Sequence, residues 1–425
     1  MAVTTIRTLQ PLAEAGHRMR LLTLLAALPL FASTFHYVPD VLPLYYLSKL
    51  WPFLTLPVAA IGYFRLKLPA RLLYVAGIAY LISIPPFMAM LYLQSSLYEA
   101  TLTVVKFMPL TFYFSLSLML AWLRPTSAEL RQSITVLGTV TYVVMVVLWV
   151  TVPASNYRNE WFPNTIFLSD DGQRGARIQM PMFFGLLLIF QLCHDLVRRF
   201  RLIDLCKLLL CFAVQLTIYK ERIPIAFSLL IVMLTFVSSM MRSRILGVLV
   251  LGFLGAGTLA AGLVVLGLGS LEGKFGGSLS VRIDTTVLAW NYIVADPLRW
   301  IVGVGATTRY ASFTTAMMFR DPFFVLQDIG WLGVVFEAGL IGSLFIAAMY
   351  AFGIWVAEAT LKDKDGVMPA MADYALYIAA SSVIYSPTYL PAELAFVTAV
   401  AVYLLRTYGG QPGRQWNVSG IKPMI

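Results

Sequence analysis

Five cationic side chains fall in three short segments of this chain. Arg174 and Arg177 lie in the first segment, Lys220 and Arg222 in the second, and Arg282 in the third. A guanidinium stays charged and offers a fork of donors that matches phosphate oxygens, whereas an ammonium binds them as a point charge. Together these residues predict a site for a phosphorylated ligand, although any single arginine could instead contact lipid headgroups or pair with a carboxylate.

Two carboxylates stand beside these cations and could do acid–base chemistry. Asp328 opens an apolar stretch, and Glu221 separates Lys220 from Arg222. A partly buried carboxylate can accept the proton of a sugar hydroxyl as a general base. Asp328 is the first candidate for that role and Glu221 the second. Asp328 could equally cap the helix that follows it, and Glu221 could simply pair with an adjacent cation.

Other kinds of catalytic site have little support in the sequence. The three histidines are isolated from one another, and the three cysteines show neither metal-ligand nor disulfide spacing. We also find no Walker loop, no Gly-x-Ser-x-Gly and no nucleotide fingerprint. These absences disfavour ATP-driven pumping and metal-dependent transfer, so we expect no metal and no cofactor.

The elements that carry these residues are apolar. Of 425 residues, 59% are hydrophobic and 12% charged, against roughly 25% charged in a soluble domain. The apolar runs do not alternate with period two, which favours membrane-spanning helices over a barrel. We therefore expect an all-α, polytopic membrane protein with a single domain over 1–425. About twelve spans are predicted, at 20–37, 42–64, 72–93, 101–123, 132–152, 180–197, 205–219, 223–240, 245–269, 326–356, 369–386 and 392–406.

Basic loops predict the orientation of these spans. With the N-terminus in the cytoplasm, 19 of the 31 Lys and Arg residues fall in cytoplasmic segments, as the positive-inside rule requires. Both termini are then cytoplasmic. The other cations concentrate in two outer loops, 153–179 and 270–325, and at the hinge around Glu221. The positive-inside rule also explains the net charge of +10, so we expect no nucleic-acid partner.

The long outer loop, 270–325, contains a predicted amphipathic helix. Ser280 is a plausible N-cap and Pro297 a stop. Between them one apolar stripe repeats at helical spacing, at Ile283, Val287, Trp290 and Val294. Such a helix would lie on the membrane surface or against the bundle. The following Gly303-Val304-Gly305 predicts a tight turn where the backbone can approach a ligand closely.

Several motifs occur in an order that matches a known family. They are Lys220-Glu221-Arg222-Ile-Pro; then Arg282, Trp290, Asp296-Pro297-Leu298 and Gly303-Val304-Gly305; then Asp328-Ile-Gly330-Trp-Leu-Gly333 and Glu337-Ala-Gly339-Leu-Ile-Gly342. In this order they resemble the O-antigen ligase and polymerase superfamily of bacterial polysaccharide assembly, with Arg222 at the arginine of its Ser-Arg-Gly hinge. The spacing from Arg174 to Gly185 is similar to an arginine motif of the polymerases. The resemblance covers roughly residues 170 to 345.

The resemblance implies a GT-C-like helix bundle that transfers glycan from undecaprenyl diphosphate at the periplasmic face of the bacterial inner membrane. The ligase branch usually has a histidine near the end of the long loop, where this chain has Val325-Leu326-Gln327-Asp328. We therefore expect a Wzy-type polymerase that joins lipid-linked oligosaccharide repeat units, with a chain-length regulator as a partner. An O-antigen ligase acting on lipid A core is the alternative enzyme, and a secondary transporter or flippase is the alternative of another class.

The resemblance also suggests a role for each candidate residue. The cations would hold the donor's diphosphate and stabilise its charge as it leaves; they are Arg177, Arg222 and Arg282, with Arg174 and Lys220. Asp328, or failing that Glu221, would take the proton from the acceptor hydroxyl. Displacement without a covalent enzyme intermediate would invert the anomeric centre.

Overall fold

The computed structural model describes residues 3–36, 38, 41–153, 157, 168–170, 175–241, 277–306, 313–359 and 367–408. The predicted span 245–269 and the candidate Arg174 lie outside the described residues. The fold and the site are therefore built from the other segments.

The first part of the chain folds into helices. They are α1 (Val3–Phe31), α2 (Leu42–Leu54), α3 (Leu56–Arg65), α4 (Arg71–Tyr92), α5 (Leu97–Thr103), the 3-10 turns η1 (Val104–Lys106) and η2 (Met108–Thr111), α6 (Phe112–Leu123) and α7 (Ser127–Thr151). Capping boxes satisfy the first backbone N–H groups of two helices, through Ser96 and Glu99 at α5 and through Thr126 and Glu129 at α7. Local sequence thus fixes where these helices begin.

The second part begins with a short antiparallel hairpin, β1 (Leu168–Asp170) and β2 (Ala176–Ile178), inside the predicted loop 153–179. This hairpin is a small departure from the all-helical expectation. The elements that follow it are α8 (Phe183–Arg198), α9 (Leu202–Val214), the π-helical turn η4 (Gln215–Tyr219), α10 (Arg222–Met241), α13 (Gly277–Val294), α14 (Pro297–Val302), α15 (Thr315–Phe319), η5 (Leu326–Asp328), α16 (Gly330–Ala359), α17 (Val367–Ser381), η6 (Pro387–Tyr389) and α18 (Pro391–Tyr408).

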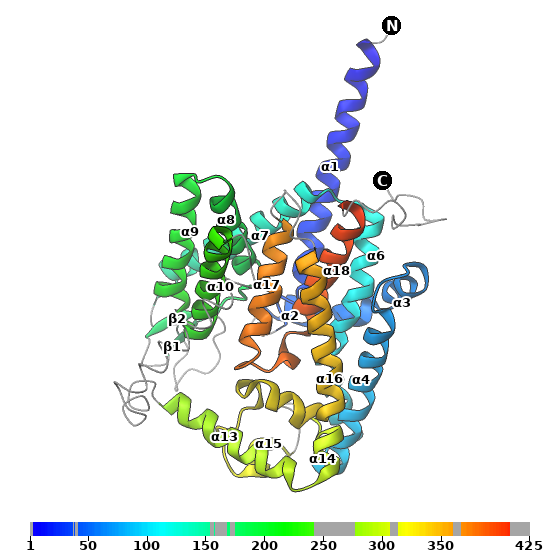
Figure 1. The fold of residues 1–425 in the computed structure, drawn as a ribbon, viewed down its shortest axis with the longest axis vertical. Coiled ribbons are helices and arrows are strands. Elements are labelled where there is room, and N and C mark those ends of the chain that lie inside the picture. The colour runs from blue at the N-terminus through cyan, green and yellow to red at the C-terminus, as the bar shows by residue number, and fades with distance from the viewer. Residues whose placement is uncertain are drawn as a thin grey trace.

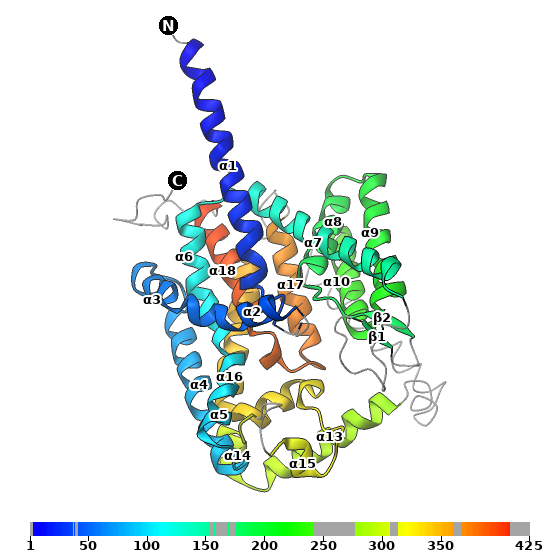
Figure 2. The ribbon, with the colours of Figure 1, turned by 180° about the vertical axis from the view of Figure 1, so that it is seen from behind.

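The long helices form a bundle, and a layer of short ones lies across one of its ends. In Figure 1, α1 begins and α18 ends at the same end of the bundle, while α13, α14 and α15 lie at the opposite end. Helix α16 packs against α4, α17 and α18, and α8 packs against α7, α10 and α17. Figure 2 shows from behind that α1 and α2 cover the face opposite α16. The first residues of α1 and the last residues of α18 therefore lie on the same side of the bundle, which a topology with both termini in the cytoplasm requires.

Several of these helices can cross a membrane. Six described helices or continuous helix pairs have the length and apolar composition of a span, and a seventh results if the pair Leu97–Lys106 and Met108–Leu123, bent by 45°, counts as one. Helices α8 and α17 have only 16 and 15 residues, against the roughly 20 that the hydrocarbon core requires. The chain is thus a polytopic, predominantly helical membrane-spanning protein, while the count of about twelve spans stays a prediction.

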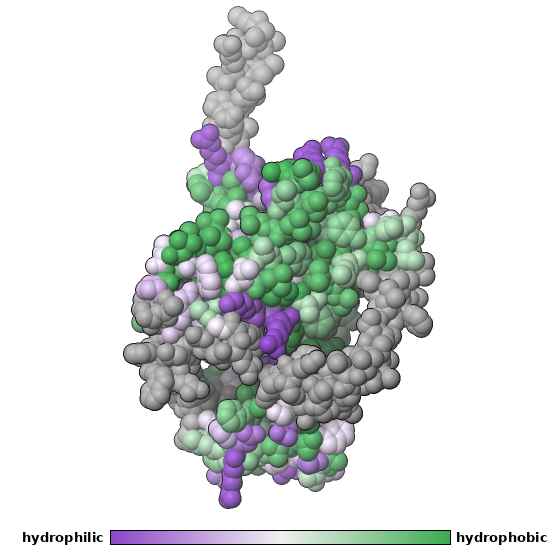
Figure 3. Space-filling model, turned by 90° about the vertical axis from the view of Figure 1, so that its left-hand side faces the viewer, coloured by the Kyte–Doolittle hydropathy of each residue, from purple (hydrophilic) through white to green (hydrophobic). Residues whose placement is uncertain are grey.

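The outer surface of the bundle is apolar. Large hydrophobic side chains are exposed along the outward faces of α7, α9 and α10, among them Val150, Leu210 and Met240. Figure 3 shows such an apolar surface, with hydrophilic residues at its upper edge and again across its lower part. Exposure of this surface to water would be unfavourable, whereas apolar side chains are expected where a helix bundle faces lipid.

Helix α16 is kinked where a loop packs against its backbone. Gly339 has φ of 67°, and the backbone N–H groups of Val304 and Gly305 donate to the carbonyls of Phe336 and Glu337 at 2.7 and 3.1 Å. A Cβ at Gly303 would lie 2.5 Å from the Gly339 nitrogen. The predicted tight turn is therefore present, but the backbone it approaches is the kinked helix. Where a ligand was expected, the two glycines approach helix backbone, that of α16 at Gly303 and that of α4 at Gly305.

Helix α13 matches the predicted amphipathic helix with corrections at both ends. It begins at Gly277, before the predicted cap Ser280, and Pro297 opens α14 as well as following α13, since proline is well suited to a first helical position. The predicted stripe is exposed, with Ile283, Val287, Trp290 and Val294 between 47% and 55% accessible. The bundle instead contacts the other side, where Ala289 and Ile293 are buried. Of the two predicted placements, the structure excludes packing of this stripe against the bundle.

Candidate functional site

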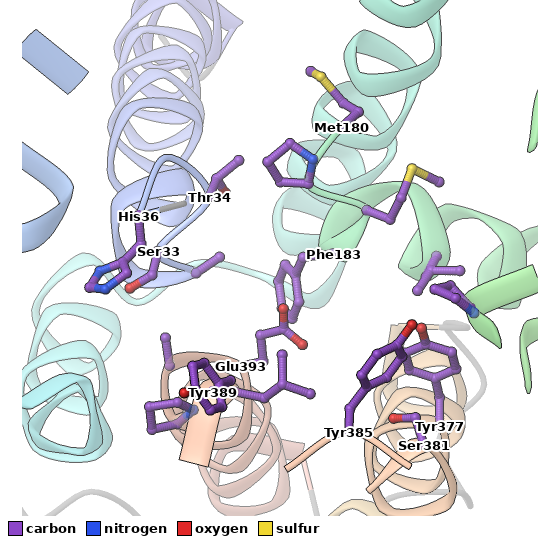
Figure 4. A pocket seen from close by; sticks show the side chains of 18 of the residues that line it. Ser33, Thr34, His36, Met180, Phe183, Tyr377, Ser381, Tyr385, Tyr389 and Glu393 are labelled. Carbon is purple, nitrogen blue, oxygen red and sulfur yellow. The ribbon is translucent and has the colours of Figure 1, made fainter. Parts of the chain in front are cut away.

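A cavity of about 450 Å³ lies where several helix ends converge. Its lining comes from the turns after α1 and α17, the starts of α8, α10 and α18, and η5. Figure 4 shows side chains from these segments pointing into the shared space. The volume lies within the range of about 300–1,000 Å³ that small-molecule sites occupy. Both predicted carboxylates, Glu221 and Asp328, line it.

Glu221 is held by a predicted arginine. The guanidinium of Arg177 donates from Nη1 to Oε1 of Glu221 at 2.6 Å, and from Nε to Oγ of Ser169 at 2.9 Å. Ser169 and Arg177 are opposite each other in the β1–β2 hairpin, so the hairpin fixes the direction of the arginine. The side chains of Arg177 and Glu221 are only 12% and 21% exposed. The pair is therefore largely shielded from bulk water.

Asp328 is held by a second predicted arginine. Nη2 of Arg282, on α13, lies 3.4 Å from Oδ2 of Asp328, in η5. The Nε donor of Arg282 is buried without a hydrogen-bond partner among the described residues. A buried donor left without an acceptor is costly, and an added anion would satisfy it. Asp328 therefore contacts a cation, and it lies two residues before Gly330, the first residue of α16.

The remaining predicted cations are not equivalent. Lys220 adopts a left-handed conformation with φ of 54°, and its Nζ donates to the Ala176 carbonyl at 2.9 Å, which ties η4 to β2. Arg222 is exposed in the first turn of α10 and does not line the cavity. Arg177 and Arg282 do not line the cavity themselves, but each pairs with a carboxylate that does, at two different places on the cavity wall. The structure leaves Arg222 at the surface beside Glu221.

A third ion pair joins a residue of the cavity wall to α16. Nζ of Lys106, at the bend between α5 and α6, contacts Oε2 of Glu337 in α16 at 2.6 Å, and the two side chains are 16% and 3% exposed. Lys106 also lines the cavity, with Nζ 5.2 Å from the ring centre of Tyr389. Glu337 is therefore paired inside the bundle.

His36 belongs to the cavity wall in the turn that follows α1. Burial, and then the nearby Lys49 cation, lower the pKa of His36 from 6.5 to about 4. The imidazole is therefore neutral near pH 7, and it contributes no positive charge to the cavity. Among the residues that the structure describes, no group of three His, Cys, Asp or Glu side chains is arranged to hold a metal ion.

Sequence analysis missed one carboxylate of the cavity. Glu393 lies in the first turn of α18, lines the cavity, and accepts a hydrogen bond from the Tyr374 hydroxyl at 2.5 Å. In Figure 4 it projects between Phe183 and Tyr389, with Tyr377 and Tyr385 across the cavity. One sequence signal could have identified Glu393: it is an acidic residue at the start of an otherwise apolar helix. Charged residues within membrane segments are rare and usually functional.

The cavity can bind a ligand that has both polar groups and faces that pack on aromatic rings, and its carboxylates can accept a proton from that ligand. Among the residues that the structure describes, three carboxylates, one lysine and several tyrosines line the cavity, and two arginines form ion pairs with two of these carboxylates. Acid–base chemistry needs a carboxylate within hydrogen-bond reach of the reacting hydroxyl, and anion stabilisation needs oriented cationic donors. No family model and no curated protein sequence matches this chain.

Proposed function

We propose that this protein polymerises oligosaccharide repeat units, linked to undecaprenyl diphosphate, into a bacterial surface polysaccharide at the periplasmic face of the inner membrane. The proposal includes about twelve spans, cytoplasmic termini, a Wzy-type family membership and a partner that sets chain length. It requires neither a metal nor a nucleotide.

One observation carries the proposal. Glu221 and Asp328, separated by more than a hundred residues of sequence, line one cavity at one end of an apolar bundle, and each is bonded to a predicted arginine. Lipid diphosphates need this combination, because the lipid tail stays in the membrane while the charged head meets donors at its edge. The unsatisfied Nε of Arg282 adds a donor without an acceptor in the described structure.

The proposed mechanism uses exchange of ion-pair partners. Arg177 and Arg282 turn from their carboxylates to the diphosphate oxygens, since a diphosphate carries more charge and accepts bidentate bonds. Exposed Arg222 approaches the same head from the rim, with Lys220 and Arg174 as further cations. A carboxylate of the cavity then accepts the acceptor's proton; Asp328 and Glu221 are the sequence-derived candidates. The arginines stabilise the departing diphosphate.

The test is incubation of purified protein with undecaprenyl-diphosphate-linked repeat units, without metal or nucleotide, followed by sizing of the products. We expect a ladder of multiples of the repeat unit. Transfer to added lipid A core in place of a ladder would identify a ligase. Absence of any product, with intact and monodisperse protein, would remove the enzyme proposal.

A secondary transporter is the second candidate, and one observation favours it. Asp373, fully buried in α17, contacts Nε2 of His194 and Oγ1 of Thr235 at 2.8 Å each. Buried ionisable groups inside a membrane bundle often mark proton or ion pathways. Uptake of labelled repeat unit or sugar into proteoliposomes, with no change in product size, would support transport over polymerisation.

A further inference from the structure

Glu393 is the carboxylate of the cavity that sequence analysis did not assign. It is partly accessible, whereas its neighbours on α18, Ala392 and Leu394, are 4% and 2% exposed. It lines the cavity, and Figure 4 shows its carboxylate directed toward the open centre. The accessible surface of Glu393 is thus presented to a ligand in the cavity.

The three cavity carboxylates differ in what already binds them. Glu221 and Asp328 each contact an arginine. Among the described residues, Glu393 makes no ion pair, and it accepts a hydrogen bond from the neutral hydroxyl of Tyr374. A carboxylate offers about four lone-pair positions, so Glu393 keeps acceptor capacity for a hydroxyl of the ligand. Its Tyr374 bond fixes the orientation of the group.

The surroundings of Glu393 suit a sugar ring. Tyr219, Tyr377, Tyr385 and Tyr389 line the same cavity, with Phe183 beside Glu393. Tyrosine combines an apolar ring face with a hydroxyl that donates and accepts hydrogen bonds. Pyranose rings have the matching pattern, with C–H groups on their faces and hydroxyls at their edges. A phosphate group would find fewer cationic partners here than beside Arg177 or Arg282.

We propose that this part of the cavity binds the terminal sugar of the acceptor glycan, and that Glu393 accepts the proton of its attacking hydroxyl. The inference rests on the proposed polymerase function. The hydroxyl oxygen forms a bond to the anomeric carbon of the donor while the bond from that carbon to the diphosphate oxygen breaks. The proton passes to the Glu393 carboxylate, and the electron pair of the broken bond leaves with the diphosphate. Glu221 and Asp328 then serve to position Arg177 and Arg282.

The test compares Glu393→Gln with Glu221→Gln, Asp328→Asn and a control, Glu358→Gln, in the reconstituted polymerisation reaction. Glu358 lies near the end of α16 and does not line the cavity. We expect Glu393→Gln to lower the rate by at least about 100-fold, the usual loss on removing a general base. Binding of undecaprenyl diphosphate, measured separately, should stay unchanged in Glu393→Gln and Glu358→Gln. A Glu393→Gln enzyme that keeps more than about a tenth of the rate would overturn the inference.

Two further variants keep the test informative if Glu393→Gln does not fold. Glu393→Asp retains the carboxylate and should keep a measurable rate, while Tyr385→Ala should raise the KM for a soluble repeat-unit acceptor more than it lowers kcat. If Glu393→Asp and Tyr385→Ala both behave like wild type, the acceptor site is elsewhere. If a ladder forms with wild type and only Asp328→Asn abolishes it, the polymerase stands and Glu393 is not the base. If wild type forms no ladder, the polymerase proposal itself fails.

Discussion

The Lys106–Glu337 ion pair allows a quantitative test of how α16 packs at the cavity wall. The pair joins the bend between α5 and α6 to α16 at 2.6 Å, and Glu337 is 3% exposed. At that distance an effective dielectric near 20 gives a gross attraction of about 6 kcal/mol, which desolvation of both groups largely offsets. Lys106→Met removes the attraction but leaves the Glu337 carboxylate buried. We expect a loss of about 3–5 kcal/mol in the free energy of unfolding.

Equilibrium unfolding in mixed micelles measures this loss, and a double variant identifies its cause. In Lys106→Met/Glu337→Gln neither charge remains, so the double variant should be at least about 2 kcal/mol more stable than the sum of the single losses predicts. The Arg131–Asp195 pair is a matched control, because its Arg131 side chain is 37% exposed. Disrupting that pair should cost less than about 1 kcal/mol.

Two outcomes would refute this reasoning. Losses below about 1 kcal/mol for Lys106→Met would mean that water or another cation reaches Glu337 in the membrane. Strictly additive losses in the double variant would mean that the two side chains do not interact.

Three further outcomes follow from other parts of the structure. Arg222→Ala should abolish polymer in cells while the protein stays in the membrane; undiminished chain length would remove Arg222 from the mechanism. Gly303→Ala should lower the free energy of unfolding by roughly 3 kcal/mol or more, because the new side chain would be strained at φ of 87° and would contact α16. Thermal unfolding measures this loss, and an unchanged midpoint would argue against the close approach of the turn to α16. Because the pKa of His36 in the folded protein is lowered to about 4, wild type should lose stability as pH falls from 6.5 toward 4. The His36→Gln variant should lose less stability over this range, which a pH series of melting curves would detect.

Much of the site could be anticipated from residue type and order. Glu221 and Asp328 are predicted site residues because each lies at the end of a long apolar stretch on the predicted outer side, and both line the cavity. Membrane topology brings the outer ends of helices to one level, so residues at those ends are already restricted to one layer.

The partners of these residues could not be anticipated. Periodicity does not say which helices are neighbours, so the Arg177–Glu221 and Arg282–Asp328 bonds and the position of Glu393 depend on tertiary packing. Pro297 illustrates the same limit, because a proline can follow one helix and begin the next. The exposed placement of Arg222 also required the structure, since its sequence neighbour Glu221 lines the cavity.

The central claim, that paired arginines bind a lipid diphosphate, is tested most directly by the affinity of purified protein for undecaprenyl diphosphate. We compare wild type with Arg177→Gln/Arg282→Gln, and with Arg299→Gln as a control. Arg299 does not line the cavity and is held by Asp296 and the Tyr292 carbonyl in the α13–α14 layer. Each lost charge-assisted bond should cost about 1.5–3 kcal/mol, so the double variant should bind at least about 100-fold more weakly, while Arg299→Gln should bind like wild type. Equal affinity of wild type and the double variant would contradict the claim.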